Sequence, residues 1–195
     1  MQSEKAGSSG NWRRVFFWLV EAGTALPCYN TVVPVTPLRM NEKRNLFKLF
    51  QSDTGLLCAA SLREDTQIQL LLGNLQISSG SILENVFAQE LRSKGLDLYY
   101  YGTKKIGELD FVVQNGKAVD VLEIKHGADY RKHSALDRAL QVQDWPFRQK
   151  IVFCKSNVFE EHGILYLPFY MIMFCARKEE KKLIWDPLSP NFNDT

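Results

Sequence analysis

Two apolar segments separated by a short polar turn limit most strongly how this chain can fold. Residues 107–113 and 117–125 are rich in Val, Leu, Ile and Phe, and Asn115-Gly116 lies between them. Asn-Gly is the pair that most easily adopts the positive φ angles of a type I′ turn. We therefore expect a β-hairpin with Asn115 and Gly116 as its two-residue loop.

The predicted pairing collects charged side chains on one face of the hairpin. It sets Glu108 opposite Glu123 and Asp110 opposite Val121. Side chains alternate between the two faces of a strand, so Glu108, Asp110, Glu123 and Lys125 are expected on the same face. Asp110 and Glu123 become diagonal neighbours, roughly 7–8 Å apart at the backbone. Two carboxylates can close such a span around one cation.

The charges in this hairpin have two interpretations. Acidic residues near strand ends are usually solvated, and a Glu followed two residues later by a Lys is often only a polar edge. The neighbouring residues, however, are apolar on both faces, which is typical of a central strand pair that is covered on both sides. Charges in such a place are costly unless they are paired or bind a metal. We therefore favour a divalent cation site over a solvated edge.

These residues resemble the PD-(D/E)xK nuclease signature, in which an Asp on one strand and a (D/E)-x-K on the next form the active site. From about Val15 to Phe174, the chain also resembles the C-terminal domain of a family of bacterial and archaeal AAA-type ATPases. That domain has no assigned function and is regarded as restriction-endonuclease-like. The segments that carry the resemblance are residues 18–23, 53–57, 83–91, 107–112 and 123–125.

The resemblance implies partners as well as a fold. Members of that family usually begin with an ATPase module, yet the sequence contains no G-x-x-x-x-G-K-[ST] phosphate loop. ATP hydrolysis therefore cannot be assigned to this chain. We expect either a fragment of a longer protein that lacks its N-terminal ATPase module or a form that has lost it, with an AAA-type ATPase as a possible partner and DNA as the expected substrate.

Each charged residue receives a role from cation chemistry. Mg²⁺, or Mn²⁺ in its place, takes about six oxygen ligands and keeps several waters. Asp110 and Glu123 would be direct ligands, and Glu108 and Glu84 would be outer or alternate ligands. Lys125 would orient the attacking water while the metal stabilises the charge on the phosphoryl and leaving oxygens. Catalytic residues are thus expected at Asp110, Glu123, Lys125 and Glu84.

Two residues of the helix expected after Ser81 allow alternatives. Glu84 lies at the margin of the apolar stripe and could reach the hairpin, or it could complete a capping box with Ser81. Glu90 lies nearer the middle of the stripe, where it would pair with a basic residue or anchor Lys125.

We expect an α/β fold in four segments. Residues 1–10 are a polar leader, 11–75 a winged-helix-like segment, 81–176 a restriction-endonuclease-like domain and 177–195 a loosely held tail. The first segment contains a helix capped by Asn11 and extended pieces within 25–40, followed by mostly helical residues at 46–73. The nuclease-like segment contains a helix from Ser81 to Gly95, a strand at 96–101, the hairpin, a helix within 132–145, a strand at 150–154 and buried strands within 163–176.

The composition of the chain limits which partners and which cellular location we expect. The formal net charge is +2, so bulk charge neither supports nor excludes a nucleic-acid partner. Arg39, Lys43 and Arg44 could contact phosphates or form a solvated turn.

The four cysteines are scattered, which is typical of free thiols in a reducing cytosol. We detect no secretory signal, and the longest uncharged run is too short to span a bilayer. We expect a cytoplasmic protein without a membrane partner.

The histidines are not expected to act in catalysis. His126 would point to the opposite face from the acids if the strand continues, and His133 and His162 have no partner pattern.

Three functions stay open: a metal-dependent endonuclease acting on DNA, a catalytically silent module that binds DNA or regulates an ATPase, and a structural ion-pair cluster of Lys125 with Glu108 and Glu123.

Overall fold

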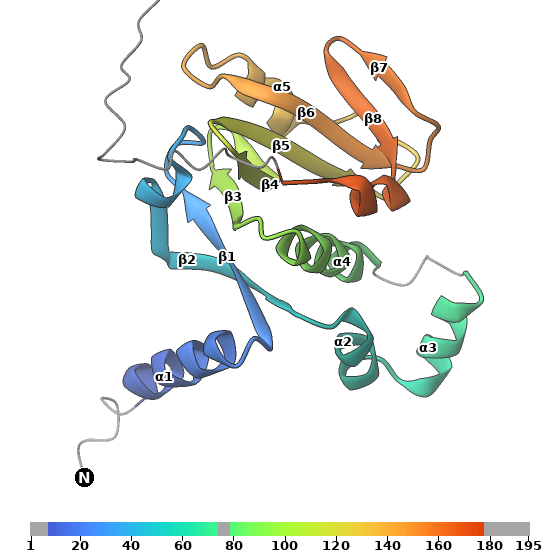
Figure 1. Cartoon of the computed structure of the whole chain (residues 1–195). Coiled ribbons are helices and arrows are strands. Elements are labelled where there is room, and N and C mark those ends of the chain that lie inside the picture. The colour runs from blue at the N-terminus through green and yellow to red at the C-terminus, as the bar shows by residue number, and fades with distance from the viewer. Residues whose placement is uncertain (1–7, 74–78, 178–195) are drawn as a thin grey trace, which may run out of the picture.

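The computed structural model describes residues 8–73 and 79–177, and it has a mixed α/β fold (Figure 1). Eight strands form one sheet: β1 (Ala25–Thr31), β2 (Glu42–Gln51), β3 (Leu98–Thr103), β4 (Gly107–Asn115), β5 (Ala118–Lys125), β6 (Phe147–Cys154), β7 (Phe159–Glu161) and β8 (Ile164–Pro168). Their order in space is β2-β1-β3-β4-β5-β6-β8-β7. The helices are α1 (Ser8–Glu21), α2 (Thr54–Ser61), α3 (Glu64–Leu71), α4 (Ser79–Ser93) and α5 (Ser134–Leu140), with short 3-10 helices at Leu38–Met40 and Phe169–Phe174.

Strand directions change along the sheet. β3, β4 and β5 form an antiparallel meander, whereas β5, β6 and β8 run parallel to one another. A parallel pair needs a crossover connection, and α5 lies in the connection between β5 and β6. The predicted order of helix, three strands, helix and strand is therefore present from α4 to β6.

Helices cover both faces of the central strands. Phe87 and Leu91 of α4 are fully buried against Phe111 and Phe153 of the sheet. Leu136 of α5 is buried in a second core on the opposite face. The central strands are therefore apolar on both sides, as the residues flanking the acids predicted.

The end of α4 is as predicted, but its start is not. Gly95 has a positive φ of 72°, and the Leu96 N–H donates to the Leu91 carbonyl, as in a glycine-terminated helix. The helix already begins at Ser79, so Ser81 is its third residue. Of the two roles considered for Glu84, the capping box with Ser81 is therefore excluded, because Ser81 lies inside the helix.

The N-terminal elements differ from the prediction. α1 begins at Ser8, so Asn11 is not its cap and the predicted leader cannot include residues 8–10. The second extended piece is β2 at 42–51, beyond the expected 25–40, and helices α2 and α3 follow it. β1 pairs in parallel with β3, so the ribbon continues the main sheet instead of standing apart as the ribbon of a winged helix would. The sheet thus crosses the boundary predicted between 11–75 and 81–176.

The C-terminal apolar run is a strand followed by a short helix. β8 is the expected buried strand, but residues 169–174 form a 3-10 helix. Pro168 ends the strand because it has no N–H to donate to a neighbouring strand. Residues 1–7 of the predicted leader and 178–195 of the predicted tail lie outside the described residues. Among the described helices, none is long and apolar enough to cross a membrane.

Candidate functional site

The predicted hairpin is present, but its register is shifted by two residues. Asn115 pairs with Ala118 and Phe111 with Leu122, so the turn residues are Gly116 and Lys117. Gly116 has a φ of 67°, and a glycine at the first turn position is typical of type II′ rather than type I′. A shift of two residues leaves each side chain on its own face, whereas a shift of one would reverse the faces.

A β-bulge in β4 breaks the strict alternation that we predicted. Tyr99 pairs with Val112 and Tyr101 with Leu109, so β4 has one residue more than β3 in this stretch. Leu109 and Val112 pack in the core under α5, while Phe111 packs under α4. Bulges redirect side chains and occur often beside functional sites. Asp110 lies within this irregular stretch.

Asp110 links the two strands of the hairpin. Its Oδ2 accepts a hydrogen bond from the Ile124 N–H at 2.8 Å, beyond the last backbone pair of Phe111 with Leu122. The carboxylate therefore takes a place that a backbone carbonyl would have in a regular ladder. Burial raises the pKa of Asp110, although the Ile124 N–H and the charge of Lys125 oppose that shift.

Glu123 is the most deeply buried of the acids, with 1% of its side chain exposed. Its Oε2 lies 3.1 Å from the Lys125 ammonium nitrogen, while its Oε1 is buried with no hydrogen-bond donor among the described residues. Burial and then the neighbouring charge of Asp110 raise the pKa of Glu123 to about 8. A buried carboxylate oxygen without a donor is costly. Binding a proton or a cation at this oxygen would remove that cost.

Lys48 of β2 is part of the site, and the sequence analysis did not find it. Its ammonium nitrogen lies 2.6 Å from Glu108 and 3.3 Å from Glu84, and it lies over the ring of Tyr100 at 5.3 Å. Burial by itself would lower the pKa of Lys48, but the hydrogen bond with Glu108 and the charge of Glu84 raise it. Residue 48 falls in the segment 46–73 that we expected to be mostly helical, and that prediction is wrong for 46–51, which belong to β2. Only the pairing of β2 with β1 and of β1 with β3 brings Lys48 here.

The structure thus brings the five predicted residues to one region but divides them into two groups. Asp110, Glu123 and Lys125 form the group on the hairpin, while Glu84 of α4 and Glu108 of β4 share Lys48. Burial raises the pKa of Glu84, and the charge of Asp110 contributes to this shift against the effect of Lys48. Because Lys48 contacts both Glu84 and Glu108 of β4, Glu84 lies next to the hairpin, which is the inward placement considered for it.

Comparison with known families covers about half of the chain. Residues 79–171 match the family model described as a domain of unknown function, DUF4143. The matched segment runs from the start of α4 into the 3-10 helix after β8, so it contains the predicted acids and Lys125 but not Lys48. No curated protein and no solved structure gives a match.

Asp110 and Glu123, the two direct ligands predicted for a divalent cation, both lie within the matched segment. In residues 8–73 and 79–177, no three His, Cys, Asp or Glu side chains form a group that could hold a metal. Magnesium, however, is commonly bound through one or two carboxylates, with waters and substrate phosphates completing the octahedron. The buried Oε1 of Glu123 accepts no hydrogen bond from a donor among the described residues, and the Asp110 carboxyl group lies within interaction distance of Glu123.

The remaining candidates lie elsewhere. Glu90 pairs with Lys94 at 3.9 Å, whereas Lys125 pairs with Glu123. His126 is exposed, and His162 lies in the turn before β8 with a φ of 51°.

His133 is a buried histidine that has partners, contrary to the expectation from sequence. Its Nε2 lies 2.7 Å from the Tyr166 hydroxyl, and its Nδ1 lies 2.8 Å from Asp137. These contacts join α5 and its N-terminal end to β8, which indicates a structural role.

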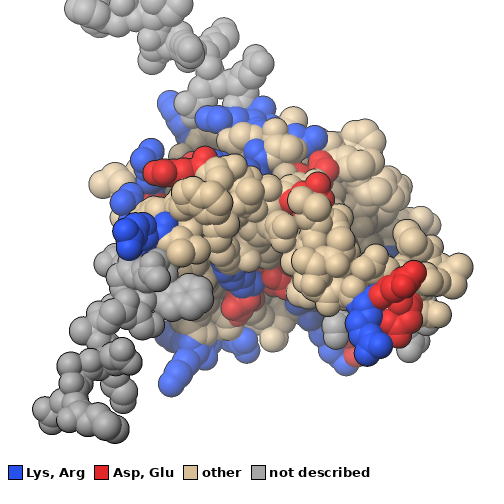
Figure 2. All heavy atoms as spheres, turned by 90° about the horizontal axis from the view of Figure 1, so that it is seen from below, with Lys and Arg blue, Asp and Glu red and all other residues tan. Residues whose placement is uncertain are grey.

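Basic side chains do not form one continuous band on the face shown in Figure 2, where they occur in several groups with acidic residues between them. Of the predicted phosphate contacts, Arg44 is 2.7 Å from Glu42, while Lys43 and Arg39 are exposed.

Proposed function

We propose that this chain is a metal-dependent nuclease that hydrolyses phosphodiester bonds of DNA with Mg²⁺ or Mn²⁺. The observation that carries the proposal is the buried Oε1 of Glu123, which has no donor among the described residues and lies beside Asp110. A buried and a half-buried carboxylate with raised pKa values, together with an adjacent ammonium group, are typical of functional sites.

The chain's own residues would divide the work as follows. Asp110 and Glu123 would hold the ion, and the hydrogen bond from the Ile124 N–H fixes the Asp110 carboxylate to the residue that follows Glu123 in β5. Lys125, half-buried and 3.1 Å from Glu123, would orient the attacking water and stabilise negative charge on the phosphate. The ion, when bound, would supply Lewis-acid stabilisation of the phosphoryl oxygens.

Nicking of supercoiled plasmid DNA tests this proposal. We expect Mg²⁺- or Mn²⁺-dependent nicking by the purified chain, and loss of nicking in Asp110→Asn with the fold retained in circular dichroism. Asp129→Asn is the matched control, because Asp129 is an exposed aspartate whose ion pair with Lys132 lies on the surface. Absence of cleavage by the purified chain with either metal would contradict the proposal.

A second candidate is favoured by the position of Lys48. Because Lys48 already pairs with both Glu84 and Glu108, the site resembles an ion-pair cluster more than a four-carboxylate metal centre. The chain would then be a catalytically silent module that binds DNA or regulates an AAA-type ATPase. This second function predicts salt-dependent binding of DNA or of an ATPase without turnover, with the same affinity in wild type and Asp110→Asn.

A third possibility is a purely structural ion-pair cluster. A melting temperature that does not change with Mg²⁺ would favour it.

A further inference from the structure

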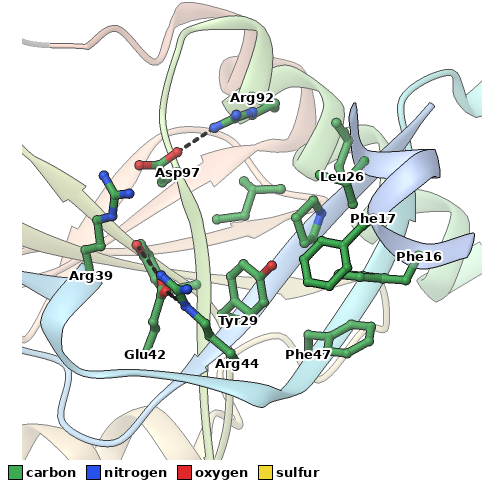
Figure 3. A pocket seen from close by; sticks show the side chains of 14 residues that line it. Phe16, Phe17, Leu26, Tyr29, Arg39, Glu42, Arg44, Phe47, Arg92 and Asp97 are labelled. Carbon is green, nitrogen blue, oxygen red and sulfur yellow. Dashed lines mark hydrogen bonds and ion pairs between the residues drawn. The ribbon is translucent and has the colours of Figure 1, made fainter. Parts of the chain in front are cut away.

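A cavity of about 700 Å³ lies between α1 and the strands β1, β2 and β3, apart from the candidate site on the hairpin. Figure 3 shows aromatic side chains on one side of it and arginines on the other. Neither the hairpin acids nor Lys125 line this cavity. Its volume falls within the usual range for small-molecule sites, about 300–1,000 Å³.

The aromatic side of the cavity is open to solvent. The rings of Phe16 and Phe47 lie 4.5 Å apart, and Tyr29 meets Phe47 edge-on at 6.2 Å. Phe17 is 55% exposed and Phe47 is 40% exposed. Exposed rings gathered at one concave place mark a binding site more often than a chance surface feature.

The opposite side of the cavity carries arginines. Arg39 makes no ion pair within the described residues, and Arg44 and Arg92 pair with Glu42 and Asp97 on the cavity rim. The Arg44 and Arg92 side chains are 75% and 50% exposed, so both guanidinium groups can turn toward a ligand. Three guanidinium groups face two carboxylates here, which leaves the rim positive.

We propose that this cavity binds a nucleotide. Its base would stack against Phe47 and Tyr29, and its phosphate would contact Arg39 at the rim. Every nucleobase has a π face that stacks on aromatic rings, and guanidinium groups bind phosphate through paired donors. An apolar ligand would leave the arginines unused, and a bare anion would leave the rings unused. The proposal does not depend on the nuclease proposal, because the two sites share no side chain.

The nucleotide has two possible sources, a free mononucleotide or one unit of single-stranded DNA. Calorimetric titration of the full chain with adenosine monophosphate, with inorganic phosphate and with a short single-stranded oligonucleotide, all without divalent cations, distinguishes them. Binding of the monophosphate points to a free nucleotide, and binding of the oligonucleotide alone points to DNA. Either result supports the proposal.

Two variants, each with a control, test whether the nucleotide binds in this cavity. We expect Phe47→Ala to weaken binding about 5- to 150-fold, the range for one base stacked on an aromatic ring, and Arg39→Ala to weaken it and reduce its salt dependence. The controls are Leu46→Ala, an exposed apolar residue of the same strand, and Lys104→Ala, an exposed basic residue, neither of which lines the cavity.

Three results would overturn the proposal. One is no binding of the monophosphate or the oligonucleotide. Another is inorganic phosphate binding as tightly as the nucleotide, which would show that the rings contribute nothing. A third is equal effects of the cavity variants and their controls. Thermal denaturation of each variant shows whether it is folded, and Phe47→Leu replaces Phe47→Ala if the latter is not.

Discussion

The Lys48 ammonium nitrogen lies 2.6 Å from a carboxylate oxygen of Glu108 and so connects β2, at one edge of the sheet, to the candidate site. The same ammonium group contacts Glu84 of α4. One cation from outside the matched family segment is therefore shared by two of the acids that the sequence analysis considered as metal ligands.

Replacing Lys48 should change how the site responds to divalent cations. In Lys48→Met, Glu84 and Glu108 lose their counter-charge, so we expect a loss of about 1–2 kcal/mol in the free energy of unfolding without cations. We also expect a larger rise in melting temperature on adding Mg²⁺ than in wild type. Thermal denaturation across a Mg²⁺ titration measures both. Lys43→Met, exposed on the same strand, is the control, and an unchanged Mg²⁺ response would contradict this role of Lys48.

The raised pKa of Glu123 predicts a pH dependence of stability. Its pKa rises from the ordinary 4.5 to about 8, because burial and the charge of Asp110 favour the neutral form. The folded state therefore holds a proton that the unfolded state releases. This stabilisation is complete below pH 4.5 and is lost as the pH rises to about 8, with a slope of up to about 1.4 kcal/mol per pH unit.

Urea denaturation in the presence of a chelator, from pH 5 to pH 9, measures this dependence. Glu123→Gln cannot ionise, so its stability should change less with pH than that of wild type. Glu160→Gln removes an exposed glutamate of β7 and should retain the wild-type slope. Parallel curves for wild type and Glu123→Gln would show that Glu123 does not carry the proton.

Lys125 should matter for cleavage more than for folding if the nuclease proposal is correct. Its Nζ lies 3.1 Å from Glu123 at the end of β5. Removing one charged donor from a reacting centre typically costs about 100- to 1,000-fold in rate, so we expect at least about a 100-fold slower plasmid nicking by Lys125→Met. Lys117→Met, exposed in the hairpin turn, should nick at the wild-type rate. Equal rates for the two variants would remove Lys125 from the reaction.

Asn85 should be important for stability and not for the chemistry of the site. Its buried side chain accepts a hydrogen bond from the Gln51 N–H at 2.8 Å and donates to the Gln51 carbonyl at 2.9 Å and the Thr54 hydroxyl at 2.8 Å. Asn85→Ala leaves buried groups of the β2–α2 junction unpaired, so we expect a loss of about 1–3 kcal/mol. Chemical denaturation measures it, and the exposed Asn157→Ala should change stability by less than about 0.5 kcal/mol. Similar values for the two variants would contradict this role.

The local patterns predicted most of the central elements. The apolar residues on both faces of 107–125 predicted a covered hairpin, and Gly95 predicted the end of α4, because a glycine with positive φ terminates a helix at little cost. The hairpin register was wrong by two residues, since Asn115-Gly116 and Gly116-Lys117 both contain a glycine that can form a tight turn. Both registers keep each side chain on the same face, so the prediction that Asp110 and Glu123 lie close together did not depend on that choice.

Local patterns were enough to find the residues that form the acidic group and to place them on two neighbouring strands, because side-chain periodicity and turn chemistry are local properties. The pairing of that group with cations depends on the tertiary fold. The bulge in β4, the parallel pairing of β1 with β3 and the resulting approach of Lys48 to Glu84 and Glu108 depend on contacts between segments far apart in the chain. Such contacts are selected by the packing of the whole sheet, and no local pattern around Lys48 encodes them.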